Sequence, residues 1–86
     1  MPATIKLPTP LRRHADQAKT VEVPVGTVAQ ALQALVEAHP AMQGAIYDGT
    51  GEIKPFVRVF VGPKDIADLN GPATVLGEGD VLSIIP

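Results

Sequence analysis

The sequence contains no cysteine and no tryptophan, and it has only one tyrosine and two phenylalanines. The absence of cysteine excludes disulfide bonds, thiolate metal ligands and a cysteine nucleophile. The scarcity of aromatic rings argues against the stacking platforms that bind single-stranded nucleic acid. With 86 residues, the chain corresponds to one domain that can fold alone with little margin of stability.

The chain also lacks a large excess of charge of one sign, and it has no long apolar run. The formal net charge is −2, and the seven basic residues are scattered along the chain. Electrostatic binding of nucleic acid needs a concentrated basic face, so we expect no nucleic-acid partner. No apolar run approaches the roughly 20 residues that cross a bilayer, and the N-terminus lacks the pattern of a signal peptide. We therefore expect a cytoplasmic protein with no membrane partner.

Groups of side chains that could form a catalytic or metal site are missing from the sequence. His14 and His39 are the only histidines, and neither has a carboxylate three or four residues further on, so we interpret both as solvated. Ser83 is the only serine and lies in a strand pattern. The Gly-x-Gly pairs at 49–51 and 77–79 lack the third glycine of a dinucleotide fingerprint. We expect a protein that is not itself an enzyme, with no bound metal or cofactor.

The clearest secondary-structure signal is a helix that begins after Gly26. Thr27 is a favourable N-cap, and Gln30 completes the T-x-x-Q pattern of a capping box. Pro40 ends the helix because it disfavours helical geometry at the preceding residue. The apolar residues between these limits share one helical face: Val28, Ala31, Leu32, Leu35 and Val36.

Four segments show the alternation of β-strands, namely residues 4–7, 20–25, 56–61 and 81–85. In the third, we expect the valines at 57, 59 and 61 in the core, because the opposite face would have to bury Arg58. Residues 41–54 are expected to be a connector. The order β, β, α, β, loop, β predicts an α+β fold, a β-grasp with a mixed sheet of about four to five strands and one main helix. We expect a single domain over residues 1–86.

Several segments together carry a family resemblance that covers most of the chain. They are the opening strand ending in Leu11-Arg12, Gly26-Thr27-Val28 at the helix start, the central strand 56–61, and Gly79-Asp80 with 83–86 at the end. In this order and spacing they resemble the ThiS/MoaD family of ubiquitin-like sulfur-carrier proteins. The length and the central strand look closest to the longer MoaD-like carriers, which supply sulfur to cysteine or secondary-metabolite synthesis.

The resemblance implies that the function resides in a C-terminal carboxylate. In the family, a flexible tail ending in Gly-Gly follows the last strand. A ubiquitin-activating-like adenylyltransferase adenylates the tail and converts it to a thiocarboxylate, using ATP and a sulfide source. The sulfur then passes to a biosynthetic synthase, and a metalloprotease that trims the tail is a further implied partner. No Gly-Gly follows Pro86 here, and we expect that the sequence is truncated at this point.

Docking on such an enzyme would use the open face of the sheet. The resemblance implies apolar partner contacts at Ile85 and Pro8, and we include the adjacent Pro86. Alternation adds Phe60 on the same face as Ile85, and Arg58 as a contact at its rim. In the alternative interpretation, Phe60 is a core residue and the valines face a second layer. Arg58 would then be a solvated arginine without a partner role.

Three alternatives to this function stay open at the level of sequence. The chain could be the small subunit of molybdopterin synthase, with its tail inserted in a large subunit. It could be a β-grasp binding module without sulfur chemistry. It could also be a protein modifier that is joined to lysines through the same tail. A modifier would form isopeptide bonds, whereas a sulfur carrier would transfer sulfide.

Overall fold

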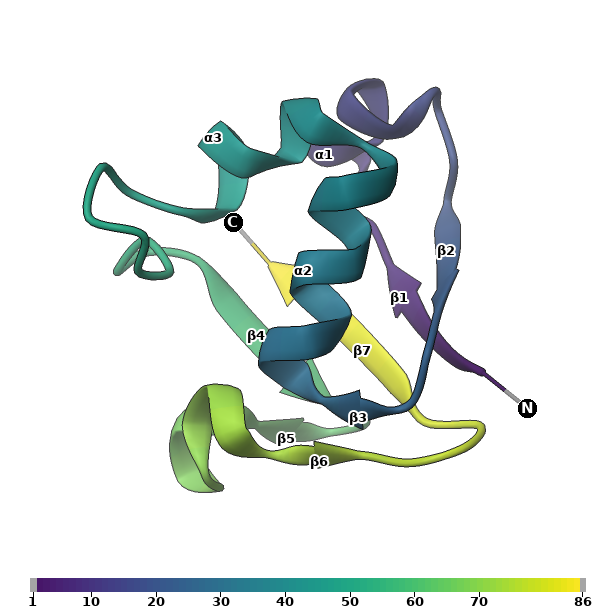
Figure 1. Ribbon diagram of the computed structural model, residues 1–86, viewed down its shortest axis with the longest axis vertical. Coiled ribbons are helices and arrows are strands. Elements are labelled where there is room, and N and C mark those ends of the chain that lie inside the picture. The colour runs from purple at the N-terminus through teal and green to yellow at the C-terminus, as the bar shows by residue number, and fades with distance from the viewer. Residues whose placement is uncertain (1, 86) are drawn as a thin grey trace.

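A five-stranded mixed sheet and one long helix form the fold (Figure 1). The computed structural model describes residues 2–85. The sheet has the order β2-β1-β7-β4-β5, in which β1 and β7 are parallel and the other neighbours are antiparallel. Its strands are β1 Ala3–Lys6, β2 Thr20–Val23, β4 Arg58–Val61, β5 Lys64–Asp65 and β7 Val81–Ile85. The fold is the α+β β-grasp that the sequence predicts.

Short elements occupy the connections between the main strands and the helix. A second sheet pairs β3 Gly26–Thr27 with β6 Val75–Leu76. The connector predicted at 41–54 contains regular structure, and an isolated bridge joins Tyr47 to Ile53. The short helices are α1 Thr9–Arg12, η1 Arg13–Ala15, η2 Pro40–Met42, α3 Gln43–Ile46, η3 Ile66–Asp68 and η4 Gly71–Ala73. Within residues 2–85, no helix combines the length and apolarity that a membrane span requires.

The long helix α2, Val28–Ala38, begins with the predicted capping box. The Gln30 backbone N–H donates to Thr27 Oγ1 at 3.2 Å, and the Thr27 N–H donates to Gln30 Oε1 at 2.9 Å. These two bonds satisfy amide groups that a helix start leaves without intrahelical partners. The helix ends before Pro40, as the sequence predicts, and its buried face packs on the sheet.

Replacing Thr27 by alanine is expected to lower the free energy of unfolding by about 1 kcal/mol, because the cap on the Gln30 amide is lost. Urea unfolding monitored by circular dichroism measures this change. The control is Thr20→Ala, since Thr20 is exposed in β2 and makes no capping bond; we expect a change within about 0.5 kcal/mol. Equal losses in the two variants would contradict a stabilising role for the cap.

The core lies between α2 and the inner face of the sheet. Val57 and Val59 are buried there, and so are Leu82 and Ile84 of β7. This confirms the prediction that the valines of the central strand face the core, and Phe60 lies on the opposite face. The full set of buried apolar residues is Ala3, Ile5, Leu7, Leu11, Ala15, Val23, Val28, Ala31, Leu32, Leu35, Met42, Ile46, Val57, Val59, Ile66, Leu76, Leu82 and Ile84.

Three predicted strand ends are wrong. Alternation predicts that the first strand reaches Leu7, and the resemblance extends it to Leu11-Arg12, but β1 ends at Lys6 and Leu11-Arg12 lie in α1. Val25 was expected to continue the strand at 20–25, but β2 ends at Val23 and Val25 is exposed. The following Pro24 has no N–H for a sheet ladder, which explains the earlier end. Phe56 was expected in the strand at 56–61, but β4 begins at Arg58 and Phe56 is exposed.

Candidate functional site

The face of the sheet turned away from α2 is centred on β7, which lies between β1 and β4. Side chains alternate across a strand, so neighbours in β7 point to opposite faces. Ile84 is 1% exposed in the core, whereas the next residue, Ile85, is 47% exposed. Ile85 is therefore a large, solvent-exposed apolar side chain at the end of β7.

The neighbours of β7 define the rest of this face. Strand register places Ile85 opposite Arg58, and Ser83 opposite Phe60 on one side and Lys6 on the other. Phe60 is half-buried in this position. We name these five residues, Lys6, Arg58, Phe60, Ser83 and Ile85, the open-face patch. The structure thus brings together three of the predicted partner contacts, while their binding of a partner stays a prediction.

Pro8 and Pro86 are the other two predicted contacts. Pro8 is half-buried and precedes α1, two residues beyond the end of β1 at Lys6. Because Lys6 is in parallel register with Ser83, Pro8 and Ile85 each lie two residues further along in the same direction. This register supports the prediction that Pro8 and Ile85 lie near each other. Pro86 lies outside the described residues.

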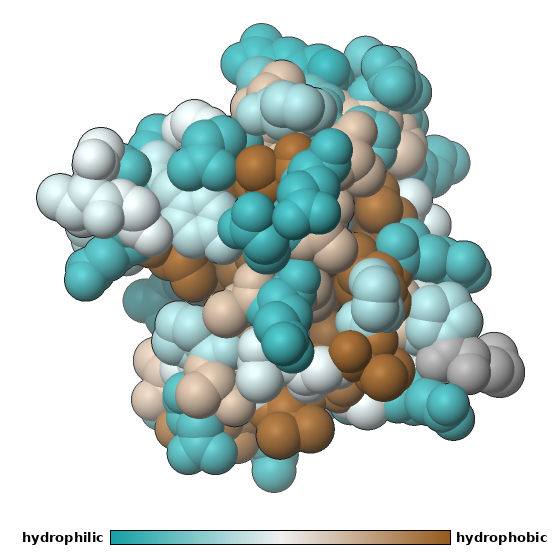
Figure 2. Space-filling model, viewed as in Figure 1, coloured by the Kyte–Doolittle hydropathy of each residue, from teal (hydrophilic) through white to brown (hydrophobic). Residues whose placement is uncertain are grey.

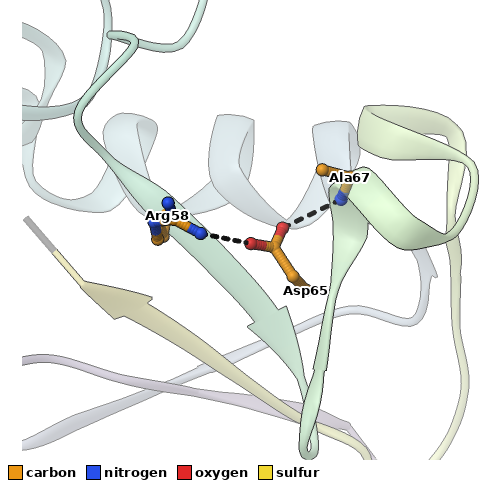
Figure 3. Close-up of polar contacts among 3 residues, drawn as sticks. All are labelled: Arg58, Asp65 and Ala67. Carbon is orange, nitrogen blue, oxygen red and sulfur yellow. Dashed lines mark hydrogen bonds and ion pairs between the residues drawn. The ribbon is translucent and has the colours of Figure 1, made fainter.

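An ion pair fixes the rim of the patch beside Ile85. Arg58 Nη1 lies 3.3 Å from Asp65 Oδ2, with the Arg58 side chain 70% exposed and that of Asp65 16% exposed (Figure 3). The other oxygen of Asp65 accepts a 2.9 Å hydrogen bond from the Ala67 N–H (Figure 3). Asp65 is held in place, while most of Arg58 is accessible. Such an exposed pair adds little stability.

Sequence reasoning did not include Asp65 in the site. The signal that could have found it is the tight turn at Gly62 and Pro63, because a two-residue hairpin loop pairs Val61 with Lys64 and hence Phe60 with Asp65. An acidic side chain opposite Phe60 is then diagonal to Arg58 on the same face.

No side-chain cluster with the composition of a metal site was found in the described part of the chain, residues 2–85. His14 and His39 are both partly buried, and they lie on separate segments, η1 and the C-terminal end of α2. The open-face patch presents apolar surface at Ile85 and Phe60 and positive charge at Lys6 and Arg58.

A polar turn lies in the loop after α3. The Asp48 carboxylate accepts hydrogen bonds from the Thr50 hydroxyl at 2.6 Å, the Thr50 N–H at 2.8 Å and the Glu52 N–H at 3.2 Å. The Thr50 hydroxyl is the largest cause that lowers the pKa of Asp48 below its ordinary value, followed by the Thr50 amide. The pKa of the neighbouring Tyr47 phenol is raised, because burial disfavours its charged form.

The Asp48 turn is expected to loosen on acidification. Because the pKa of Asp48 is lower in the folded state, its stabilisation is present above the unfolded pKa and is lost as the pH falls through the folded pKa. NMR titration should show the Asp48 carboxyl carbon and the Thr50 amide changing together. Thr50→Ala should raise the pKa of Asp48, since it removes the hydroxyl donor. An unchanged Asp48 titration in that variant would contradict the assignment.

Comparison with known proteins gives sulfur carriers and small archaeal modifier proteins as relatives. The ThiS family model matches residues 5–86. The sulfur carrier protein CysO of Mycobacterium tuberculosis is 27% identical over 88 residues, covering 100% of this chain and 95% of the relative. Small archaeal modifier protein 1 of Haloferax volcanii is 37% identical over 75 residues, covering 79% of this chain and 77% of the relative.

Solved structures agree with the sequence relatives. The crystal structure of Mycobacterium tuberculosis CysO has a TM-score of 0.89 and 27% identity, covering 98% of this chain and 97% of that chain. A chain in the crystal structure of the Amycolatopsis orientalis BexX/CysO complex has a TM-score of 0.90 and 26% identity, covering 98% and 93%. Because the family match spans nearly the whole chain, this protein belongs to the ThiS family.

Proposed function

We propose that this protein is a sulfur carrier whose C-terminal carboxylate is adenylated and then thiocarboxylated by an activating enzyme. The observation that carries the proposal is the position of Ile85. Strand β7 ends in this exposed isoleucine, which lies opposite Arg58 in the sheet. An enzyme that docks on this face would be positioned to receive the segment that follows. Similarity to CysO supports the sulfur chemistry.

The proposed reaction needs no catalytic side chain from this protein. A carboxylate oxygen attacks the α-phosphorus of ATP, and pyrophosphate leaves, which gives an acyl adenylate. Sulfide then attacks the acyl carbon, and AMP leaves as the thiocarboxylate forms. The partner enzyme supplies ATP binding and the sulfide source, and a biosynthetic synthase accepts the sulfur. This protein contributes recognition through the open-face patch.

The composition of the patch favours a particular kind of docking surface. Ile85 and Phe60 supply apolar contact area, and an exposed apolar group surrounded by polar residues is typical of an interface. Lys6 and Arg58 place positive charge around them. We therefore expect an enzyme surface with an apolar depression and an acidic rim, because complementary charge speeds encounter and selects the partner.

The intact mass of the natural protein tests the proposal. The protein is purified from its source cells grown with and without a sulfide supply. We expect a fraction heavier by about 16 Da, the difference between sulfur and oxygen, after activation of the terminal carboxylate. That fraction should react with iodoacetamide, and the 86 residues hold no cysteine that could account for the label. A natural protein that acquires neither the mass nor the label would overturn the proposal.

A second candidate is a protein modifier, favoured by the 37% identity to small archaeal modifier protein 1. The same activated carboxylate would then form an isopeptide bond with a lysine of a target, releasing AMP. The products formed after activation distinguish the two functions. A modifier gives covalent conjugates of higher mass that survive reduction, whereas a carrier gives the free thiocarboxylate.

A further inference from the structure

The segment from η3 to η4 contains the only asparagine of the sequence, and a glycine follows it. Asn70 lies between the two short helices, and Gly71 is the first residue of η4. Figure 1 draws this segment as the coil at the lower left, and Figure 2 shows the same corner as part of the molecular surface. Asn70 and the preceding residues Asp68 and Leu69 are exposed. The Asn70-Gly71 pair is therefore accessible to water.

The side-chain amide of Asn70 is not held by the start of η4. Asn70 occupies the N-cap position, but, within the part of the chain that the structure describes, its side chain makes no capping hydrogen bond. Its backbone N–H instead donates to Thr74 Oγ1 at 3.1 Å, and its backbone carbonyl accepts the Ala73 N–H at 3.1 Å. These two bonds close the backbone of the turn and leave the side-chain amide in solvent.

Gly71 places an unhindered backbone nitrogen next to that amide. Because Gly71 is the first residue of η4, its N–H has no partner within the helix. Gly71 has a φ of +57°, and, leaving its nearby backbone aside, no described atom lies within 4 Å of the point where a β-carbon would stand. No side chain therefore obstructs the approach of the Gly71 nitrogen to the Asn70 side chain.

Asp48-Gly49 is a related pair, and its surroundings are different. The Asp48 carboxylate accepts hydrogen bonds from the Thr50 hydroxyl, the Thr50 N–H and the Glu52 N–H. These contacts, the Thr50 hydroxyl most of all, lower the pKa of Asp48, so its carboxyl group is ionised at neutral pH. The negative charge of a carboxylate disfavours attack by a backbone nitrogen, whereas the Asn70 amide is neutral. The structure thus protects Asp48 and leaves Asn70 reactive.

We propose that Asn70 is a site of spontaneous deamidation, which converts it to isoaspartate and aspartate. The Gly71 nitrogen loses its proton to water and attacks Asn70 Cγ. A new C–N bond forms, and ammonia leaves as a cyclic imide closes. Water then opens the imide at either carbonyl group. The sum replaces an amide NH₂ by a hydroxyl group and needs no oxidant or reductant. The proposal is independent of the sulfur chemistry.

The closed turn of η4 controls the rate of this reaction. Asn70 has a ψ of 23°, and ring closure requires rotation about its Cα–C bond until the Gly71 nitrogen faces Cγ. The two bonds that close the turn, from Ala73 to the Asn70 carbonyl and from Asn70 to Thr74, oppose this rotation. Surface turns with few buried contacts open at a small free-energy cost. We therefore expect the reaction to proceed in the native protein.

The product changes contacts beyond the turn. Isoaspartate routes the main chain through Cβ and so lengthens it by a methylene group before Gly71. Thr74 follows η4 directly, and its carbonyl accepts the Val28 N–H at 2.9 Å. We expect faster hydrogen exchange at the Val28 amide, at the start of α2, in the isoaspartate form. Equal exchange in the two forms would contradict this coupling.

Peptide mapping tests the proposal. The full-length protein is incubated at mildly alkaline pH and then cleaved after lysine, which places Asp48 and Asn70 in different peptides because Lys64 lies between them. We expect the Asn70 peptide to gain about 1 Da and to separate into isoaspartate and aspartate forms. The Asp48 peptide should contain no isoaspartate. A synthetic peptide of residues 65–76 gives the rate without the fold, and the protein should react within about tenfold of it.

Two substitutions at Thr74 test whether the turn controls the rate. Thr74→Val removes the acceptor of the Asn70 N–H, and deamidation should become at least about twofold faster, as loss of one hydrogen bond predicts. Thr74→Ser keeps a hydroxyl group and should react like the unchanged protein. Asn70→Gln should abolish the mass gain, and circular dichroism should report a native fold for all three variants.

Three results would overturn the proposal. The first is a native protein that reacts more than about tenfold more slowly than the synthetic peptide, because the fold would then protect Asn70. The second is modification of Asp48 in place of Asn70. The third is an equal rate in the Thr74→Val and Thr74→Ser variants, which would remove the role of the turn.

Discussion

Replacing Ile85 by aspartate is expected to lower kcat/KM for carboxylate activation by at least about thirtyfold, the effect of removing an interface residue worth about 2 kcal/mol. Ile85 is exposed on the open face, so the new charge does not enter the core. In the docked complex, however, the carboxylate would be desolvated against an apolar surface. Steady-state assays with the activating enzyme, ATP and the natural full-length protein measure the loss.

The matched control for this change is Val75→Asp. Val75 is 74% exposed in β6, away from the open-face patch, and the substitution introduces the same charge. We expect activation close to that of the unchanged protein, and circular dichroism should report a native fold for both variants. If both variants lose activity equally, the effect is one of overall charge and not of docking. Normal activation of the Ile85 variant would move the docking site away from the open face.

The parts of the fold that the sequence predicts are those with strong local signals. The T-x-x-Q pattern at Thr27 specifies both hydrogen bonds of the capping box within four residues, so no distant contact is needed. The assignment of Val57 and Val59 to the core needs only the two-residue period of a strand and the cost of burying Arg58. The same period correctly separates Ile84 from Ile85.

The parts that could not be predicted depend on contacts between distant segments. Strands β3, β5 and β6 have two residues each, too few to show a period, and they exist because a neighbouring strand pairs with them. Strand β5 ends at Asp65, where the chain turns into η3. Neither feature has a signal in the residues of β4 itself, so alternation alone does not indicate where its partner strand ends.

Ile84→Ala is expected to lower the free energy of unfolding by about 2–5 kcal/mol, because a buried isoleucine is replaced by a cavity that the sheet cannot fill. Ile84 is 1% exposed, on the face of β7 that packs against α2. A domain of 86 residues has a total stability of roughly 4–13 kcal/mol, so this one change removes a large share. Urea unfolding monitored by circular dichroism measures the loss.

The adjacent residue supplies the control, since Ile85→Ala removes the same atoms from the opposite face of β7. We expect it to cost less than about 1 kcal/mol, because the side chain is already half in solvent. In activation assays at low temperature, where the Ile84 variant is still folded, the ranking should reverse: Ile85→Ala weakens docking and Ile84→Ala does not. Equal unfolding losses in the two variants would contradict the burial difference. Normal activation of the Ile85 variant together with loss of activation in the folded Ile84 variant would contradict docking on the open face.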